Sequence, residues 1–540
     1  MNQETLNPVE LEVARNRLES ISEEVGTALI QTSYSPNIKD RRDCSAGIYG
    51  PDGMLISQAE HIPLHLGLMP TLIKNVLASY GADNLAEGDV LITNNPYLGG
   101  SHLPDMCVIT PVFWQTHLVA VVANMAHHVD VGGLTPGSMA THATEIYQEG
   151  IRVPPVKLFS TGQLDDELLS VLLTNIRTAD KTRGDIMAQV AANRLGRRRI
   201  HELLEEWGPQ RFEVSTTALV DYAARRTRAA IEQLPDGTGT FTDYLEHDGN
   251  QETPLAITVT VTVSGDQLTA DFRQTTDQVS GAVNCSGALT EGCVAYVIKL
   301  LTDPSLPSNA GLMEPIKVTA RAGSLVAANF PAPVSNGNIQ TSQRIVDALL
   351  GAFHEFATDR VPAASSGSMA IMTIGGYDEV TDQYFSYVET YGGGQGAMPD
   401  QDGASAIHTH MTNTRNTPCE VIEREYPLRV ETYRIASSTG GAGQYHGGDG
   451  LIRTLTLTRG KAQVVAGTSR VTTAPWGLNG GDDGTPGKVI RHSHEGDNPR
   501  ESMTRFEVSS GEGITIQTAG GGGYGTRHSS SKSRNPGGET

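Results

Sequence analysis

Hydrophobic residues near the start of the chain recur at intervals of three and four positions. Asn7 followed by Pro8 favours a helix start, because an asparagine side chain caps a first turn and proline is tolerated just inside it. The apolar positions that follow share one face of a helix; they are Leu11, Ala14, Leu18, Ile21, Val25 and Ala28. The pattern predicts an amphipathic helix that packs one face onto a core.

Strand-like patterns then lead to residue 130. Two β-rich runs, 106–114 and 117–125, flank the dipeptide Gln115-Thr116, a spacing typical of a hairpin with a two-residue loop. Gln-Thr is not the Asn-Gly or Asp-Gly that such a turn prefers, so the register could slip by one residue.

This hairpin gathers polar residues at its open end. Counting along the two strands places His127 opposite Pro104, directly beside Asp105 and one turn of loop from His102. A register slipped by one residue would leave them at the same end. We therefore expect three potential metal ligands to converge there.

A second hairpin is predicted around the Gly-Pro-Asp-Gly turn at 50–53. Pairing Tyr49 with Met54 puts Asp43 at the open end of this hairpin, and His65 lies in its exit loop. The alternative for the histidine is an ordinary solvated loop residue.

The middle of the chain is helical and the last third is rich in glycine. Helical periodicity spans 164–207 with a break at Gly184, and from Ile257 to Val263 apolar residues alternate with threonines, as in a half-buried antiparallel strand. The glycine clusters, with β-like runs between them, are Gly392–Gly396, Gly440–Gly450, Gly477–Gly484 and Gly520–Gly523.

Charge and cysteine content limit the partners. With 40 basic and 61 acidic residues the formal charge is −21, so the surface should repel nucleic acid and anionic membranes. The five cysteines are scattered without a CxxC pair, which favours a reducing cytoplasm over a disulfide framework or a thiolate zinc site. No apolar run approaches the roughly 20 residues of a membrane span, and the start lacks a signal-peptide core. We expect a cytoplasmic protein with no nucleic-acid or membrane partner.

The two open hairpin ends together have the composition of a metal site. His102 and Asp105, in an HxxD spacing, join His127 and Asp43 to offer two imidazoles and two carboxylates. That mix suits one borderline divalent ion, Zn²⁺, Mn²⁺ or Fe²⁺. An open coordination position would let such an ion lower the pKa of water or polarise a carbonyl. HxxD is a common combination, and its alternative is a pair of loop residues bonded to backbone amides.

We therefore predict an α+β, multi-domain protein in which antiparallel β hairpins carry the metal site, with a helical segment and a β-rich C-terminal region of glycine loops. The expected domains are an N-terminal metal-site region, 1–234, containing the helical segment 164–207, and a C-terminal α+β region, 235–527. Residues 528–540 are expected to form a flexible tail.

Nucleotide-binding motifs are missing from the chain. It contains no GxxxxGK[ST] phosphate loop and no GxSxG, and its glycine clusters lack the strand, turn and helix context of a dinucleotide site. If the reaction uses ATP, we expect the ATP pocket on another chain.

Seven stretches distributed along the chain carry a family resemblance. They are NIKDRRDCSAGIYGPDG, EHIPLHLG, NNPYLGGSHLPDMCVITPVF, AHHVDVGG, NIRTADKTRGDIMAQVAANRLGRRR, HTHMTNTRNTPCEVIEREYPLRV and TAGGGGYG. Together they resemble the hydantoinase B/oxoprolinase family. The resemblance implies the large metal-bearing subunit of a two-component enzyme, whose hydantoinase A-like partner of sugar-kinase-type fold binds ATP and Mg²⁺. The family includes ATP-dependent openers of cyclic amides and ATP-dependent ketone carboxylases.

The resemblance also implies a ligand set. In the family an aspartate of the first hairpin, the HxxD pair and a histidine of the following strand hold a divalent metal. Carried over by position, these are Asp43, His102, Asp105 and His127. Asp40 lies three residues before Asp43 and competes for its assignment.

Catalytic and substrate residues follow by proximity to these ligands. His128 and Asp130 are the candidate general bases, although strand alternation turns His128 to the opposite face from His127, where a structural role is the alternative. The loops 391–396 and 408–415 concentrate backbone amides and polar groups. They are predicted to form the substrate wall, with a subunit interface or plain turns as the alternative; the residues are Gly393, Gly394, Asn413 and Arg415.

One mechanism unites these expectations. The partner would use ATP to phosphorylate the oxygen of a ring amide (hydantoin, N-methylhydantoin, 5-oxoproline or a lactam), because amide resonance makes the ring a poor electrophile. The activated carbon would then meet water at the metal site of this chain, in a hetero-oligomer. The alternatives are a subunit of an ATP-dependent ketone carboxylase of the acetone or acetophenone type, and a non-catalytic, metal-stabilised scaffold.

Overall fold

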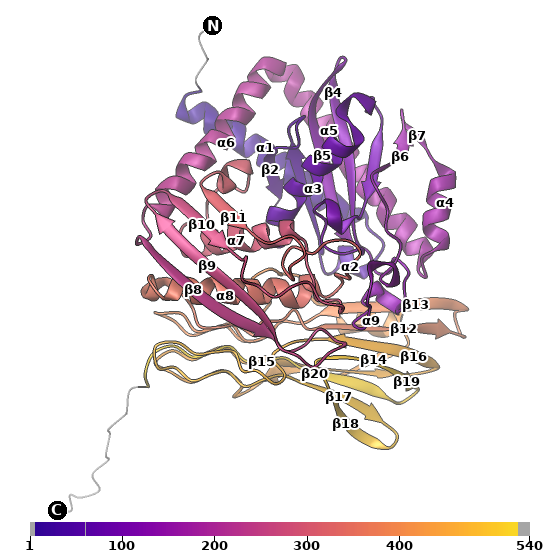
Figure 1. Cartoon of the computed structure of the whole chain (residues 1–540). Coiled ribbons are helices and arrows are strands. Elements are labelled where there is room, and N and C mark those ends of the chain that lie inside the picture. Colours follow the sequence, from indigo (N-terminus) through magenta and orange to yellow (C-terminus); the bar gives the residue numbers. More distant parts are fainter. Residues whose placement is uncertain (1–5, 60, 528–540) are drawn as a thin grey trace, which may run out of the picture.

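A seven-stranded antiparallel sheet organises the N-terminal part of the chain (Figure 1). The computed structural model describes residues 6–59 and 61–527. The strand order is β2-β1-β5-β4-β3-β6-β7, so the β1/β2 hairpin joins the β4/β5 hairpin through β1 and β5. The strands are β1 (Cys44–Tyr49), β2 (Leu55–Ala59), β3 (Val90–Thr93), β4 (Asp105–Trp114), β5 (His117–His127), β6 (Val156–Ser160) and β7 (Gln163–Leu164).

Helices cover both faces of this sheet. On one face α1 (Pro8–Thr32) and α5 (Ala179–Trp207) pack against β1, β4 and β5. On the other face lies α3 (His65–Tyr80), with α7 (Gly287–Leu301) against it. The alternation of buried side chains along the strands feeds both layers, which fixes the sheet between them.

The first helix is as predicted. The side chain of Asn7 accepts hydrogen bonds from the backbone N–H groups of Val9 and Glu10 and so caps the first turn. The predicted apolar face is buried at Ala14, Leu18, Ile21 and Val25. A short helix, α2 (Pro36–Lys39), then leads into β1.

The helical segment 164–207 is confirmed, but its break lies elsewhere. α4 (Asp166–Thr174) ends before Asn175, and Gly184 lies inside α5. A Cβ atom on Gly184 would lie 2.5 Å from the ring of Tyr34, so close packing rather than a helix end explains this glycine. A further helix, α6 (Pro209–Ile231), follows.

A second sheet, in the order β11-β10-β9-β8, packs on α8 (Ser342–His354). Its strands are β8 (Gly237–Leu245), β9 (Leu255–Ser264), β10 (Gln267–Asp271) and β11 (Ile316–Thr319), and β10 and β11 run parallel. The predicted alternation in β9 is confirmed by its burial pattern. One apolar cluster contains residues from before and after position 235, such as Leu72 and Val259, and the division into domains stays a prediction.

Two antiparallel sheets form the C-terminal part and share an apolar core (Figure 1). The first has the order β13-β12-β16-β19 and the second β14-β15-β20-β17-β18. The elements are β12 (Ile371–Asp378), β13 (Gln383–Thr390), α9 (Cys419–Glu425), β14 (Leu428–Ala436), β15 (Gly450–Leu457), β16 (Lys461–Gly467), β17 (Lys488–Ser493), β18 (Gly496–Arg500), β19 (Met503–Ser509) and β20 (Gly513–Gln517). The predicted α+β class with a β-rich C-terminal region is confirmed.

The glycine clusters bind one another through their backbones. We call the segments Gly392–Gly396, Gly440–Gly448, Gly477–Gly484 and Gly520–Gly525 the glycine layer. Within it the N–H of Gly394 donates to the carbonyl of Ala519 at 3.0 Å, and the N–H of Gly441 donates to that of Gly521 at 2.8 Å. A Cβ atom on Gly394 would lie 2.0 Å from the carbonyl oxygen of Gly448. Glycine is required here because the backbones are too close for a side chain.

Other expectations concern the surroundings of the protein. All five cysteines are unpaired. Across residues 6–59 and 61–527, no helix combines the length and apolar character needed to cross a membrane. The predicted tail, 528–540, lies outside the described residues.

Candidate metal centre

The register of the β4/β5 hairpin sets which residues meet. His127 lies opposite Asp105, not opposite Pro104 as counting predicted. The register shifts between Val112 and Phe113, and this irregularity moves the pairing by one residue.

The β1/β2 hairpin shows a similar correction. Tyr49 pairs with Leu55 rather than with Met54, and the register shifts again between Ile48 and Tyr49. Asp43 nevertheless lies at the open end, where its carbonyl oxygen accepts a hydrogen bond from the N–H of His127 at 3.0 Å.

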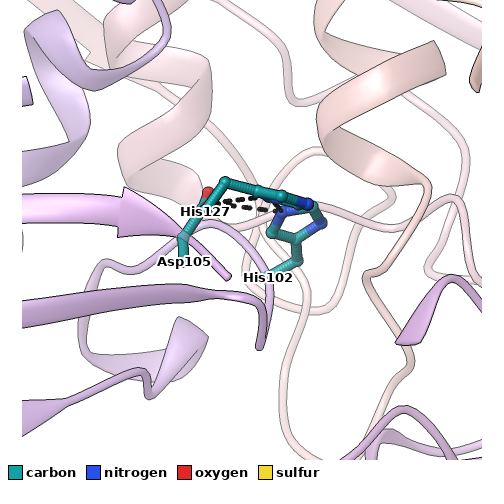
Figure 2. Close-up of side chains that lie close together, drawn as sticks. All are labelled: His102, Asp105 and His127. Carbon is teal, nitrogen blue, oxygen red and sulfur yellow. Dashed lines mark hydrogen bonds and ion pairs between the residues drawn. The ribbon is translucent and has the colours of Figure 1, made fainter. Parts of the chain in front are cut away.

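The structure brings His102, Asp105 and His127 together (Figure 2). Nε2 of His102 lies 3.1 Å from Nδ1 of His127, and Oδ1 of Asp105 lies 3.0 Å from Nδ1 of His127 and 3.4 Å from Nε2 of His102. All three residues are buried, and one donor atom from each lies within 4.8 Å of the others. Two imidazole nitrogens and one carboxylate oxygen at this spacing fit a divalent transition-metal ion.

Neighbouring groups fix the orientation of these donors. Nδ1–H of His102 donates to the carbonyl oxygen of Ser335 at 3.1 Å, which leaves Nε2 to face the cluster. On Asp105, Oδ2 accepts hydrogen bonds from the Ser101 hydroxyl and from Nδ2 of Asn338. None of these contacts is a backbone amide, so the predicted alternative of loop residues bonded to amides does not describe Asp105.

Electrostatics favour the ionised carboxylate. Burial opposes charge on Asp105, but His102 and the hydrogen bonds from His127 and His65 outweigh it and hold the pKa of this carboxyl well below its ordinary value. Burial also lowers the pKa of His102, yet the facing carboxylate of Asp105 shifts it upward overall. A deprotonated carboxylate is the form that binds a metal.

Asp43 lies beside the cluster without joining it. Its Oδ2 is 3.7 Å from the guanidinium of Arg41, and its side chain lines the same cavity as the three clustered residues. Its predicted role as a fourth ligand stays a prediction. Asp40, the competing residue, does not line this cavity.

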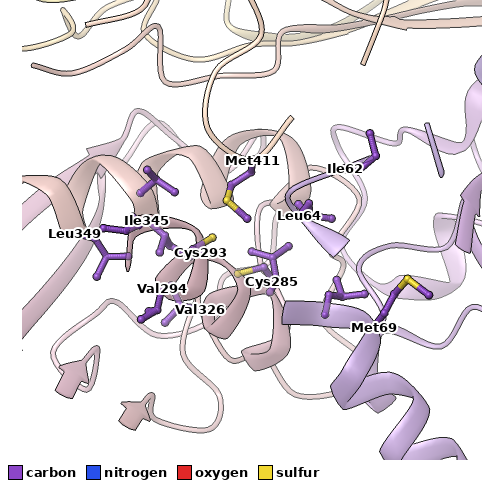
Figure 3. Packing of buried hydrophobic residues seen from close by; sticks show 14 of the residues in the cluster. Ile62, Leu64, Met69, Cys285, Cys293, Val294, Val326, Ile345, Leu349 and Met411 are labelled. Carbon is purple, nitrogen blue, oxygen red and sulfur yellow. The ribbon is translucent and has the colours of Figure 1, made fainter. Parts of the chain in front are cut away.

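The cavity at the cluster is small, about 40 Å³, and its wall has two characters. Ile62, Leu64 and Met411 form an apolar side and belong to the large core cluster shown in Figure 3. Polar groups line the rest of the wall; they are Arg41, His65, Asn338, Thr390, Thr412 and Thr414.

The candidate bases lie away from this cavity. Nε2–H of His128 donates to Oε1 of Gln189 on α5 at 3.0 Å, on the face opposite to His127 as strand alternation predicted. Asp130 accepts hydrogen bonds from the backbone N–H groups of Gly132 and Gly137 and from Arg177. Both contacts are structural, and the catalytic roles predicted for His128 and Asp130 stay untested predictions that this geometry does not favour.

The predicted substrate residues do not line the cavity either. Gly393 and Gly394 belong to the glycine layer, where Gly394 contacts other backbone segments. Asn413 and Arg415 are exposed, whereas Thr412 and Thr414 of the same segment face the cavity. The segment therefore reaches the cavity through residues that alternate with the predicted ones.

Sequence reasoning missed the segment from Ser335 to Thr341. It contributes the Ser335 carbonyl and Asn338 to the cluster, and Gly337–Thr341 forms a π-helical turn before α8. Such turns are frequent at functional sites. The signal in the sequence was the run of polar residues NGNIQTSQ entering a buried helix.

The chain has extensive similarity to known proteins. The sequence profile of the hydantoinase B/oxoprolinase family matches residues 7–527. An uncharacterized protein of Methanocaldococcus jannaschii is 37% identical over 96% of this chain and 91% of its own length. For 5-oxoprolinase 1 of Arabidopsis thaliana the identity is 35% over 96% of this chain, which spans 42% of that protein. A Pseudomonas sp. protein provisionally assigned as a D-/L-hydantoinase component is 32% identical, over 96% and 90%.

Two solved structures have similar folds. The ATP-dependent caprolactamase from Pseudomonas jessenii has a TM-score of 0.90 and 29% identity, covering 97% of this chain and 91% of its own. Acetone carboxylase in its nucleotide-free form has a TM-score of 0.87 over 96% and 76%, at 18% identity. At that identity the second likeness supports the fold alone.

Proposed function

Because the chain belongs to the hydantoinase B/oxoprolinase family, we propose that it is the metal-binding subunit of an ATP-dependent hydrolase of cyclic amides. The proposed substrates are hydantoin, N-methylhydantoin, 5-oxoproline or a lactam. The observation that carries the proposal is the buried cluster of His102, Asp105 and His127, in a chain whose fold and sequence are similar to those of ATP-dependent caprolactamase.

The chain's own residues divide the work. His102, Asp105 and His127 would hold one divalent ion, Zn²⁺, Mn²⁺ or Fe²⁺, with Asp43 as the proposed fourth donor. When bound, such an ion supplies Lewis acidity and a water ligand of lowered pKa. The buried wall excludes other water from the reaction.

The partner subunit would supply activation. A hydantoinase A-like chain is proposed to bind ATP and Mg²⁺ and to phosphorylate the ring amide oxygen, which removes the amide resonance. Hydrolysis then consumes one water, breaks the ring C–N bond and yields phosphate and the ring-opened acid. Arg41, a buried cation on the cavity wall, is suited to hold the anionic phosphoryl group.

A ketone carboxylase remains the second candidate because of the fold shared with acetone carboxylase. There the captured group would be CO₂ rather than water. A metal-stabilised scaffold is the third candidate, and it requires that a ligand variant keep full turnover.

The test is phosphate release from ATP by this chain together with a hydantoinase A-like partner. Hydantoin, N-methylhydantoin, 5-oxoproline and caprolactam are compared with acetone and acetophenone plus bicarbonate. Release with a ring-opened product, lost in His102→Ala, is the expected result. Release only with a ketone and bicarbonate would move the protein to the carboxylases, and full turnover by His102→Ala would favour the scaffold.

A further inference from the structure

Glu149 is a fully buried carboxylate behind the metal cluster. One of its oxygens, Oε1, accepts hydrogen bonds from the backbone N–H groups of Val334 at 2.9 Å and Ser335 at 2.8 Å. Its other oxygen, Oε2, has no hydrogen-bond partner within the described part of the chain. Burying a carboxylate is costly, so two charge-assisted bonds to one short segment call for an explanation.

Ser335 connects Glu149 to the cluster. Its N–H is bound by Glu149, and its carbonyl oxygen accepts the hydrogen bond from Nδ1–H of His102 at 3.1 Å. The peptide unit that contains this carbonyl is held on its other side, because the N–H of Asn336 donates to the carbonyl of Ala282 at 2.8 Å. The acceptor that orients His102 is therefore fixed from two directions.

Glu149 itself sits on a well-anchored loop. The N–H of Ile146 donates to the carbonyl of Pro331 at 2.9 Å, and the N–H of Leu134 donates to that of Gln148 at 2.8 Å. The loop that carries Leu134 is in turn held by Asp130 through the N–H groups of Gly132 and Gly137. Asp130 thus acquires a structural part in the same assembly.

We infer that Glu149 is a positioning residue for the metal ligand His102, acting through the backbone of Ser335. The inference rests on the proposed metal centre. Metal-binding histidines donate their second ring N–H to an outer acceptor, and removal of such outer groups costs about 10- to 100-fold in metal affinity. Here the outer acceptor is a carbonyl, and Glu149 is the group that holds the carbonyl in place.

A purely structural role is the competing explanation, and Asp89 offers a matched control. Asp89 is also fully buried, and its carboxylate accepts hydrogen bonds from two backbone N–H groups, those of Ala86 and Thr161, both at 2.8 Å. It differs in pairing with Lys157 and in having no contact with Ser335 or the cluster. Loss of Asp89 should affect stability without affecting the metal.

The test measures metal affinity without any substrate. Zn²⁺ is titrated against a chromophoric chelator at pH 8, and the visible absorption of the Co²⁺ form is recorded, for wild type, Glu149→Gln, Glu149→Ala and Asp89→Asn. Glu149→Gln keeps an acceptor oxygen but loses the charge, and we expect about tenfold weaker Zn²⁺ binding and an altered Co²⁺ spectrum. Glu149→Ala should lose up to about 100-fold. Asp89→Asn should stay within about twofold of wild type.

The inference is overturned if folded Glu149→Gln binds Zn²⁺ like wild type and gives the same Co²⁺ spectrum, or if Asp89→Asn weakens binding equally. Should Glu149→Ala fail to fold, Glu149→Gln alone decides. A wild-type protein that binds neither Zn²⁺ nor Co²⁺ would overturn the proposed metal centre as well. Unchanged affinity in the Glu149 variants alone would leave the proposed function intact.

Discussion

The open ends of the two hairpins and the glycine layer both contain glycine and polar residues, yet they serve opposite purposes. At the hairpin ends, side chains fill the space between strands, and three of them meet within 4.8 Å. In the glycine layer, backbones fill the space, and a Cβ on Gly394 would lie 2.0 Å from a carbonyl oxygen. A glycine cluster therefore indicates close approach, but not whether the approaching group is a ligand or the protein's own backbone.

The largest effect should come from Gly394→Ala. The added Cβ would lie 2.0 Å from the oxygen of Gly448 and 2.3 Å from the nitrogen of Gly521, and neither backbone can move without breaking the layer. We expect a loss of about 3 kcal/mol or more in the free energy of unfolding, measured by chemical denaturation. In the control Gly287→Ala, the nearest atom to the added Cβ is Cβ of Ala327 at 3.9 Å, and stability should change little. A stable Gly394→Ala protein with impaired substrate binding would restore the layer as a substrate wall.

The metal region should respond in the opposite way, by losing its ligand rather than its fold. His102→Ala removes one of the three clustered donors, and we expect Zn²⁺ affinity to fall at least about 100-fold, or about 2.7 kcal/mol. The control is His128→Ala, because His128 is equally buried, lies next to His127 and binds Gln189 on the other face. Its affinity should stay within about twofold. Equal losses in both variants would mean that the measurement reports folding, not ligation.

The sequence was sufficient for the parts of the fold that depend on local periodicity. The capped first helix, the alternation in β9 and the two hairpins follow from spacing, because each buries one face. Both hairpin registers were wrong, since counting assumes regular pairing and each ladder contains an irregularity. The Gly184 break was wrong because contact with Tyr34, far away in sequence, explains that glycine.

The site was predictable only where its residues lie on the hairpins themselves. His102, Asp105 and His127 follow from one hairpin and from the family motifs. Ser335 and Asn338 come from a segment more than 200 residues later, and no local pattern places that segment beside the cluster. In the segment 408–415, alternation cannot be phased without a strand, so the sequence does not distinguish the exposed residues from Thr412 and Thr414.

Glu149 also gives the metal region a dependence on pH that glycine residues cannot have. Burial raises the pKa of Glu149 to about 7, from an ordinary value of 4.5. The folded protein therefore holds this proton more tightly than the unfolded chain, and stability falls as pH rises between these two values. In metal-free protein we expect wild type to lose about 2 kcal/mol relative to Glu149→Gln between pH 5 and pH 8. Parallel unfolding profiles for the two proteins would contradict this expectation.

The smallest effect tests which side of the segment 411–415 faces the substrate. The guanidinium of Arg41 donates to the hydroxyl of Thr390 at 3.0 Å, and that hydroxyl lies 2.9 Å from the hydroxyl of Thr414. Thr414→Val keeps the volume but breaks this chain of polar groups on the cavity wall. We expect kcat/KM of the assembled enzyme to fall about tenfold, or about 1.4 kcal/mol, with metal content unchanged. Arg415→Ala, at an exposed position, should stay within about twofold. If Arg415→Ala costs more than Thr414→Val, the substrate meets the exposed face of this segment and the small cavity holds only the metal.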